Sequence, residues 1–235
     1  MTETPAPATQ PVPSEGGLAA AGASGSRRLV VMDVDSTLIT QEVIELIAAH
    51  AGTQDLVAAV TERAMRGELD FAESLRERVA TLAGVPVSAL DEVRRTTTFT
   101  PGARELVAEC HRRGWVVALV SGGFTEVVAP LAAELGITLF RANHLEVVDG
   151  VLTGRTTGQV VDRAYKAQAL RELAEQEGVP MDRTVAIGDG ANDLDMIAAA
   201  GIGIAFAAKP VVREQAPYSV DGPRLDAVLE IIDAA

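Results

Sequence analysis

The stretch Val30-Val31-Met32-Asp33-Val34-Asp35-Ser36-Thr37-Leu38-Ile39 decides the fold class. It is typical of a short apolar strand that ends in two carboxylates, Asp33 and Asp35, followed by two hydroxyls. Two like charges at the mouth of a buried strand repel each other unless a cation lies between them. Oxygen ligands of this kind suit Mg²⁺. The segment therefore predicts a metal, a nucleophile and an acid/base at one strand end.

Length and composition set the limits for the rest of the chain. It has 235 residues, of which 48% are apolar, so it can bury a sizeable core. A formal net charge of −13 makes it a poor candidate for binding nucleic acid or an anionic membrane. Cys110 is the only cysteine, which excludes an intramolecular disulfide and a cysteine zinc cluster. We find no apolar run of membrane-spanning length and no signal-peptide pattern, so we expect a cytoplasmic protein.

The pattern along the chain predicts three regions. Residues 1–27 are rich in Pro, Ala, Thr, Ser and Gly without apolar periodicity, which predicts a disordered tail. Residues 41–96 carry apolar residues at helical spacing and no strand pattern, which predicts a helical cap. Residues 28–40 and 97–235 alternate strand and helix patterns. The expected fold is an α/β core with a doubly wound parallel sheet and a small helical cap inserted after its first strand.

The core pattern can be divided further into elements. We expect strands at 115–120, 184–187 and 202–205, and helices near 102–113, 124–135, 164–177, 192–200 and 223–233. A hairpin is predicted over 144–161, where turn residues interrupt β-like runs. Polar clusters follow three strands, at 33–37, 121–123 and 189–193. Because ligands bind at the carboxyl ends of parallel strands, we expect these clusters to converge on one crevice.

The two acids of the first cluster can divide the work of phosphoryl transfer. Asp33 is the best nucleophile candidate, because a carboxylate can attack phosphorus to give an acyl phosphate that water then hydrolyses. Asp35 could protonate the leaving oxygen and then act as a base. The alternative is a turn with exposed acids. Two aspartates at this spacing, taken alone, often belong to such a turn.

Two further sites could hold a phosphate. Ser121-Gly122-Gly123 follows a predicted strand and precedes a helix, where free N–H groups and the helix dipole favour an anion. Lys166 lies at the start of a helix, where lysine is unfavourable unless it faces an anion. Taken alone, Ser121-Gly122-Gly123 could equally be an N-cap with a flexible turn. Lys166 alone could equally be a solvated lysine.

The segment Gly188-Asp189-Gly190-Ala191-Asn192-Asp193 supplies a second set of acids. Asp189 could ligate the metal, Asp193 could orient the metal shell, and Asn192 could hydrogen-bond phosphate. A turn with a capping residue explains one acid but not their density. Together the first acid pair, the Ser-Gly-Gly segment, Lys166 and the second set of acids predict a phosphoryl-transfer site.

These motifs resemble those of the haloacid dehalogenase superfamily. The four signatures are DVDST at 33–37, SGG at 121–123, Lys166, and GDGAND at 188–193. The resemblance covers about residues 28–235 and implies a Rossmann-like core and an aspartyl-phosphate intermediate. It also implies a Mg²⁺ ion held by Asp33, Asp189 and the Asp35 backbone carbonyl, and a phosphoryl group held by Ser121, Gly122, Lys166 and Asn192.

The cap region resembles that of the phosphoserine phosphatase family within this superfamily. Glu42 matches the acid that reads the substrate ammonium, and the segment 64–79 matches the cap signature. By this resemblance Met65 and Phe71 close over the substrate and Arg78 pairs with its carboxylate. A guanidinium can bind a carboxylate through two hydrogen bonds. Without the resemblance, Arg78 could be a surface ion pair and Glu42 a first-turn acid.

The resulting expectation is Mg²⁺-dependent hydrolysis of phosphoserine, the last step of serine biosynthesis, by a monomer or homodimer. One alternative is a related phosphatase, or a phosphotransferase that passes the phosphoryl group to an alcohol such as homoserine. A second is a catalytically silent metal- or phosphate-binding module. The complete set of acids with Lys166 favours an enzyme over this second alternative, because a binding module does not need Asp35.

Overall fold

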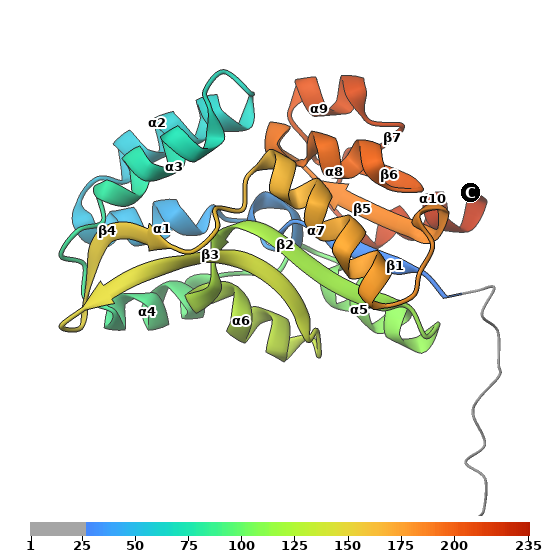
Figure 1. The fold of residues 1–235 in the computed structure, drawn as a ribbon, viewed down its shortest axis with the longest axis horizontal. Coiled ribbons are helices and arrows are strands. Elements are labelled where there is room, and N and C mark those ends of the chain that lie inside the picture. Colours follow the sequence, from blue (N-terminus) through green and yellow to red (C-terminus); the bar gives the residue numbers. More distant parts are fainter. Residues whose placement is uncertain (1–26) are drawn as a thin grey trace, which may run out of the picture.

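A computed structural model of the chain describes residues 27–235, so the predicted tail lies outside the described residues except for Arg27. The described part forms one seven-stranded sheet in the order β4-β3-β2-β1-β5-β6-β7. Helices cover both faces of the sheet (Figure 1). The predicted doubly wound α/β fold is therefore confirmed. None of the helices within residues 27–235 has both the length and the hydropathy that a membrane span requires.

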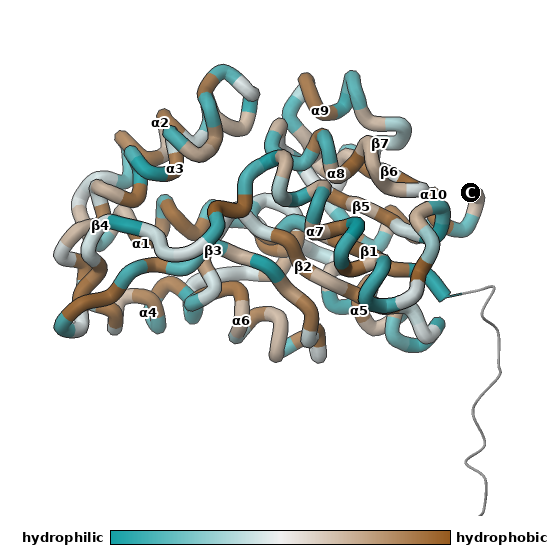
Figure 2. Tube along the Cα trace, in the orientation of Figure 1, coloured by the Kyte–Doolittle hydropathy of each residue, from teal (hydrophilic) through white to brown (hydrophobic). Residues whose placement is uncertain are grey.

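The centre of the sheet is parallel and mostly apolar. Strand β1 (Leu29–Met32) lies between β2 (Val116–Phe124) and β5 (Thr184–Gly188), and all four of its residues are buried. Strand β6 (Ile202–Phe206) continues the sheet in parallel, followed by β7 (Tyr218–Val220). A parallel sheet covered on both faces needs continuous apolar strands, and Figure 2 shows hydrophobic strands at the middle of the molecule.

The alternation of side chains along β1 divides the core into two layers. Val30 and Met32 pack in a large cluster with helices α5 (Ala103–Arg112) and α6 (Thr125–Glu134). Leu29 and Val31 point to the opposite face, against α7 (Arg163–Gln176) and α8 (Leu194–Ala199). Successive strand residues face opposite sides of a sheet, so four residues serve both layers.

The remaining helices lie between β1 and β2 or after the last parallel strands. Four helices lie between β1 and β2: α1 (Val43–Ala51), α2 (Gln54–Met65), α3 (Phe71–Ala80) and α4 (Ser88–Thr96). Helices α2 and α3 form a pair above the β3–β4 ribbon in Figure 1. The helical insertion predicted after the first strand is confirmed. Helices α9 (Pro210–Gln215) and α10 (Val228–Ala234) follow the last parallel strands.

Several predicted boundaries are wrong. The strand predicted at 115–120 continues through Phe124, so the Ser-Gly-Gly segment lies inside β2 as an irregularity of its pairing. The predicted hairpin is β3 (Leu139–Val148) with β4 (Val151–Thr157), and its first strand begins before residue 144. The helix predicted at 223–233 contains only α10 after a short 3₁₀ turn, and α9 and β7 were not predicted. Short elements carry too little periodicity to be recognised in a sequence.

Candidate active site

The three polar clusters meet at one edge of the sheet. Met32, the last residue of β1, is in register with Leu119 of β2 and with Ile187 of β5. The polar segments at the ends of these strands are therefore brought together, although more than 60 residues separate each from the next in the chain. The backbone N–H of Asp33 donates to Ile187 O at 2.9 Å, which extends the pairing by one residue. The predicted convergence of 33–37, 121–123 and 189–193 is confirmed.

Lys166 links the first polar cluster, 33–37, to the last, 189–193. Its side chain is fully buried, and its Nζ donates to Asp33 Oδ1 at 2.7 Å and to Asp193 Oδ1 at 2.6 Å. The lysine lies in the first turn of α7, whose N-terminus is capped by Asp162. The two carboxylates raise the pKa of Lys166 even though burial lowers it. The lysine therefore stays charged and holds the two acids.

Asp193 has a positioning role. One oxygen faces Lys166, and the other accepts from the backbone N–H groups of Asp189 and Gly190 at 3.2 and 3.1 Å. Each carboxylate oxygen thus already has a partner. This arrangement fixes the loop that carries Asp189.

The residues present fit a divalent metal. Oxygens of Asp33, Asp189 and Asp193 lie within 4.8 Å of one another, and all three residues are buried. The pKa values of Asp33 and Asp189 are raised well above their usual range, first by burial and then by repulsion among the neighbouring acids. Buried like charges of this kind need a cation, and hard oxygen donors suit Mg²⁺. Thr37 Oγ1 donates to Asp189 Oδ1 at 3.1 Å and orients it.

The side chain of Asp35 is not among the three carboxylates that lie close enough together to hold a metal ion. The chain turns after β1, with Ser36 at φ 55°, and carries the Asp35 carboxylate toward α1. There it accepts from the N–H of Val43 at 2.8 Å and from Ser121 Oγ at 3.4 Å. Burial, with repulsion from Glu42, raises the pKa of Asp35 to about 7. A carboxyl group that titrates near neutrality can both donate and accept a proton.

The Ser121-Gly122-Gly123 segment is held by side chains, and the predicted helix N-terminus is displaced. Helix α6 begins at Thr125, so these glycines precede its first turn. The hydroxyl of Ser121 accepts from Gly123 N–H at 2.8 Å. Buried Asn143 donates to Gly122 O at 2.8 Å and accepts from Val161 N–H at 2.9 Å. Asn143 therefore joins this segment to the loop that leads to Lys166.

A cavity opens at this edge of the sheet. Core and cap both contribute to its lining, which includes these predicted site residues: Asp33, Asp35, Glu42, Met65, Phe71, Arg78, Gly122 and Asn192. The other predicted residues, Ser121, Lys166, Asp189 and Asp193, are joined to this lining by the hydrogen bonds described above. The structure thus brings every predicted site residue to one place.

Arg78 and Asn192 each bring a buried polar atom without a hydrogen-bond partner in residues 27–235 to the cavity wall. Arg78 is 3% exposed, and it donates to Ser74 O and to Thr61 Oγ1 within the cap. Its Nη2 has no hydrogen-bond partner within residues 27–235. Burial lowers the pKa of this guanidinium. A buried guanidinium nitrogen without a partner requires an acceptor, which a bound anion would provide.

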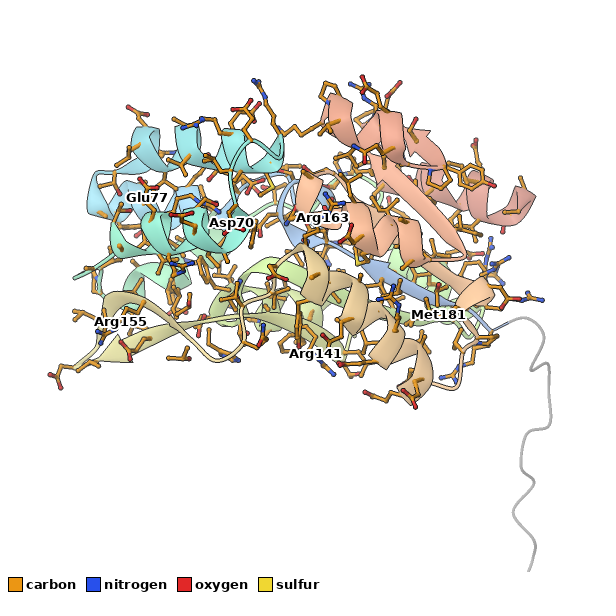
Figure 3. All side chains as sticks on the ribbon, turned by 45° about the horizontal axis from the view of Figure 1, so that its top comes forward. Asp70, Glu77, Arg141, Arg155, Arg163 and Met181 are labelled. Carbon is orange, nitrogen blue, oxygen red and sulfur yellow. The ribbon has the colours of Figure 1, made fainter. Side chains whose placement is uncertain are left out.

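Two glycines let the cap approach the core closely. A Cβ at Gly122 would lie 2.6 Å from the tip of the Phe71 ring, and a Cβ at Gly190 would lie 2.7 Å from Met65 Sδ. Any larger residue would push these two side chains off the core. Beside this contact, Asp70 and Arg163 line a second, open groove between α3 and α7 (Figure 3).

The sequence analysis missed three residues that the structure connects to the site. Thr37 orients Asp189, Asn143 holds Gly122, and Lys209 donates its backbone N–H to Asp189 O at 3.0 Å. Thr37 was quoted in the first motif without a role. Lys209 could have attracted attention because it is one of only two lysines in the chain. Asn143 has no signal in the sequence, because its partners come from distant segments.

Fold and site together define an α/β enzyme with a covered acidic site at the carboxyl edge of its central strands. The sequence model of the haloacid dehalogenase-like hydrolase family matches residues 30–198. The chain belongs to that family.

Relatives and solved structures support this assignment. The chain is 60% identical to a phosphoserine phosphatase of Streptomyces coelicolor over 88% of its length, but it spans only about half of that protein. It is 55% identical to the phosphoserine phosphatase of Streptococcus thermophilus, covering 87% of this chain and 95% of the relative. A solved phospho-aspartyl intermediate analogue of phosphoserine phosphatase superposes with a TM-score of 0.85 at 40% identity, covering 88% of this chain and 99% of that structure.

Proposed function

We propose that this chain is a phosphoserine phosphatase. The observation that supports the proposal is the cavity, whose lining includes Asp33, Glu42 and Arg78, the last with a nitrogen that has no partner in the described part of the chain. Phosphoserine carries an ammonium, a carboxylate and a phosphate. Glu42 would pair with the ammonium, Arg78 with the carboxylate, and a metal held by Asp33 and Asp189 with the phosphate. The names of the relatives described above support the same substrate.

In the first half-reaction an oxygen of Asp33 attacks phosphorus, and the bond from phosphorus to the serine oxygen breaks. Asp35 donates its proton to the leaving oxygen, which gives serine and an acyl phosphate on Asp33. Its pKa of about 7 leaves a useful fraction protonated near neutrality. In the second half-reaction, Asp35 takes a proton from water as the water oxygen attacks phosphorus. Phosphate is released and the Asp33 carboxylate is regenerated.

The groups around the phosphoryl site supply opposite charge and fixed donors. Lys166 neutralises Asp33 at 2.7 Å and limits the repulsion between the nucleophile and an anionic substrate. Asp33, Asp189 and the backbone carbonyl of Asp35 would hold a Mg²⁺ ion, which when bound supplies charge stabilisation for the phosphoryl oxygens. Ser121, Gly122 and Asn192 would hold those oxygens in place.

Substrate recognition by the cap can be tested with Arg78→Met. We expect a large rise in KM for L-phosphoserine and little change for a simple phosphomonoester without a carboxylate. Arg76→Met is the matched control, because Arg76 lies on the same helix but is exposed. Equal losses toward both substrates would contradict the assigned role of Arg78.

A substrate panel separates this function from its alternatives. It contains L- and D-phosphoserine, phosphothreonine and free acceptor alcohols, all with Mg²⁺. The proposal expects phosphate release with a preference for phosphoserine and no activity in Asp33→Asn. Asp195→Asn, which changes a partly exposed acid just after the 188–193 motif, should retain activity. Transfer to an added alcohol in place of hydrolysis would identify a phosphotransferase instead.

A further inference from the structure

The two ends of the α2–α3 pair are attached to the rest of the protein in different ways. At one end, the α3–α4 connection forms backbone hydrogen bonds to the β3–β4 hairpin: Gly84 N to Leu152 O, Leu152 N to Val85 O and Val87 N to Gly150 O, at 2.8 to 2.9 Å. This backbone pairing attaches the α3–α4 end of the helix pair to the β3–β4 hairpin. At the other end, the loop between α2 and α3 faces α9 across the site (Figure 1).

One ion pair crosses the open end. Lys209 Nζ donates to Glu62 Oε2 of α2 at 2.9 Å. Within residues 27–235 this is the only ion pair that joins the segment 43–96 to any other part of the molecule. The other contacts across this end, such as those of Phe71 and Met65 against glycine, are apolar.

The core side of this ion pair is anchored at the catalytic loop. The Lys209 backbone N–H donates to Asp189 O at 3.0 Å, and the residue caps the N-terminus of α9. Its side chain is 32% exposed. Partial burial lowers the pKa of Lys209, but Glu62, Asp189 and Glu42 raise it on balance, so the ammonium stays charged beside the site. The ion pair thus connects the cap directly to the loop that carries Asp189.

We propose that Lys209 is a positioning residue that holds the cap closed over the substrate through Glu62. Its effect on turnover rests on the proposed function, whereas its effect on cap opening does not. Opening requires the Lys209–Glu62 contact and the apolar contacts to separate while the hairpin end stays paired. An enzyme that must exclude water in one step and release products in another depends on such an equilibrium.

The competing explanation is an ordinary surface ion pair that affects only global stability. Exposed pairs contribute little, and their removal changes an equilibrium by about two- to fivefold. A change of that size would be hard to detect in folding but easy to measure in the balance between open and closed caps. The test must therefore follow cap opening directly.

The experiment measures hydrogen exchange of segment 65–71 in the substrate-free protein, together with KM and kcat for L-phosphoserine. The variants are Lys209→Met, Glu62→Gln, their combination, and the conservative Lys209→Arg. We expect each of the first two to speed exchange and raise KM by about two- to fivefold. The combination should add nothing further, and Lys209→Arg should behave like wild type. High salt should move wild type toward Lys209→Met, because salt screens the pair.

Arg94→Gln is the matched control, because Arg94 pairs with Asp91 within α4, outside the segment whose exchange is measured. It should leave exchange of the segment unchanged. Unchanged exchange in Lys209→Met and Glu62→Gln, or effects of the two that multiply in the combination, would overturn the proposal. If phosphoserine is not the substrate, the KM for L-phosphoserine carries no information, but hydrogen exchange of segment 65–71 still measures opening of the cap. The two failures are thereby distinguishable.

Discussion

Lys166 shows how one residue makes an acidic site possible. It is fully buried between two carboxylates, and its charge is matched by Asp33 and Asp193. Taking three charged groups out of water is costly, and only close pairing offsets that cost. Without the lysine, the two acids would face each other without a cation. We therefore expect Lys166 to matter for folding as well as for chemistry.

The prediction for Lys166→Met is a large loss of stability in the metal-free protein. Removing one partner of a buried ion pair costs about 3–5 kcal/mol. For a protein of this size each kcal/mol shifts Tm by roughly 2–4 °C. Scanning calorimetry should therefore show Tm lowered by at least about 6 °C. Arg171→Met, an exposed change on the same helix, should lie within about 2 °C of wild type. A Tm of Lys166→Met that matches this control would contradict the account.

The raised pKa values of Asp33 and Asp189 predict how the metal and pH act together. A carboxyl whose pKa is raised by folding stabilises the protein when protonated, and this contribution is lost as pH rises through the folded-state pKa. The metal-free protein should thus lose stability with rising pH. A bound Mg²⁺ removes the repulsion and competes with protons for the same oxygens.

The expected result is that Mg²⁺ raises Tm more at about pH 8 than at about pH 5.5. EDTA should abolish the difference, and Asp189→Asn should remove most of the Mg²⁺ effect. Asp195→Asn serves as the control, because Asp195 is exposed and paired with Arg163. A Mg²⁺ effect that is equal at both pH values, or that survives Asp189→Asn, would show that the ion binds elsewhere.

At the scale of elements, strand β3 changes partners at the position that matters for the site. Its first residues pair in parallel with β2, and its later residues pair in antiparallel with β4. Asn143 lies at this change and bridges Gly122 O and Val161 N–H. The strand therefore places a buried amide between two segments that we propose contact phosphate.

Asn143→Ala should weaken phosphate binding as well as folding. The substitution leaves a buried carbonyl and a buried N–H without partners, which costs roughly 1–3 kcal/mol each unless water enters. We expect a higher inhibition constant for inorganic phosphate and a lower kcat/KM. Gln159→Ala, an exposed change in the nearby loop, is the control. A Tm loss with unchanged phosphate inhibition would restrict Asn143 to a structural role.

Long, periodic elements could be predicted from the sequence, and short ones could not. The apolar strand before Asp33, the helices of the insertion and helix α7 all carry enough pattern to be recognised. The segment 139–143 was missed because it has no apolar alternation, and its pairing with β2 depends on tertiary contacts. Ser121-Gly122-Gly123 was taken for a turn because glycine usually marks one, whereas here it lies within an irregular strand.

At the scale of the whole molecule, the site exists only where cap and core meet. The core supplies Asp33, Asp35 and Asn192, while the cap supplies Met65, Phe71 and Arg78 to the same cavity. The acids could be predicted from the sequence because strand ends of a parallel sheet converge by topology. The ion pair of Lys209 with Glu62 could not, because it depends on how the cap lies over the core.

The central claim is that Asp33 carries the phosphoryl group during hydrolysis of phosphoserine. The most direct measurement is acid quenching during turnover of radiolabelled phospho-L-serine with Mg²⁺, followed by peptide mapping of the labelled protein. The account predicts label on the peptide that contains Asp33, loss of that label in a chase with unlabelled substrate, and no label in Asp33→Asn. Label on a different residue, or phosphate release by Asp33→Asn at the wild-type rate, would contradict it.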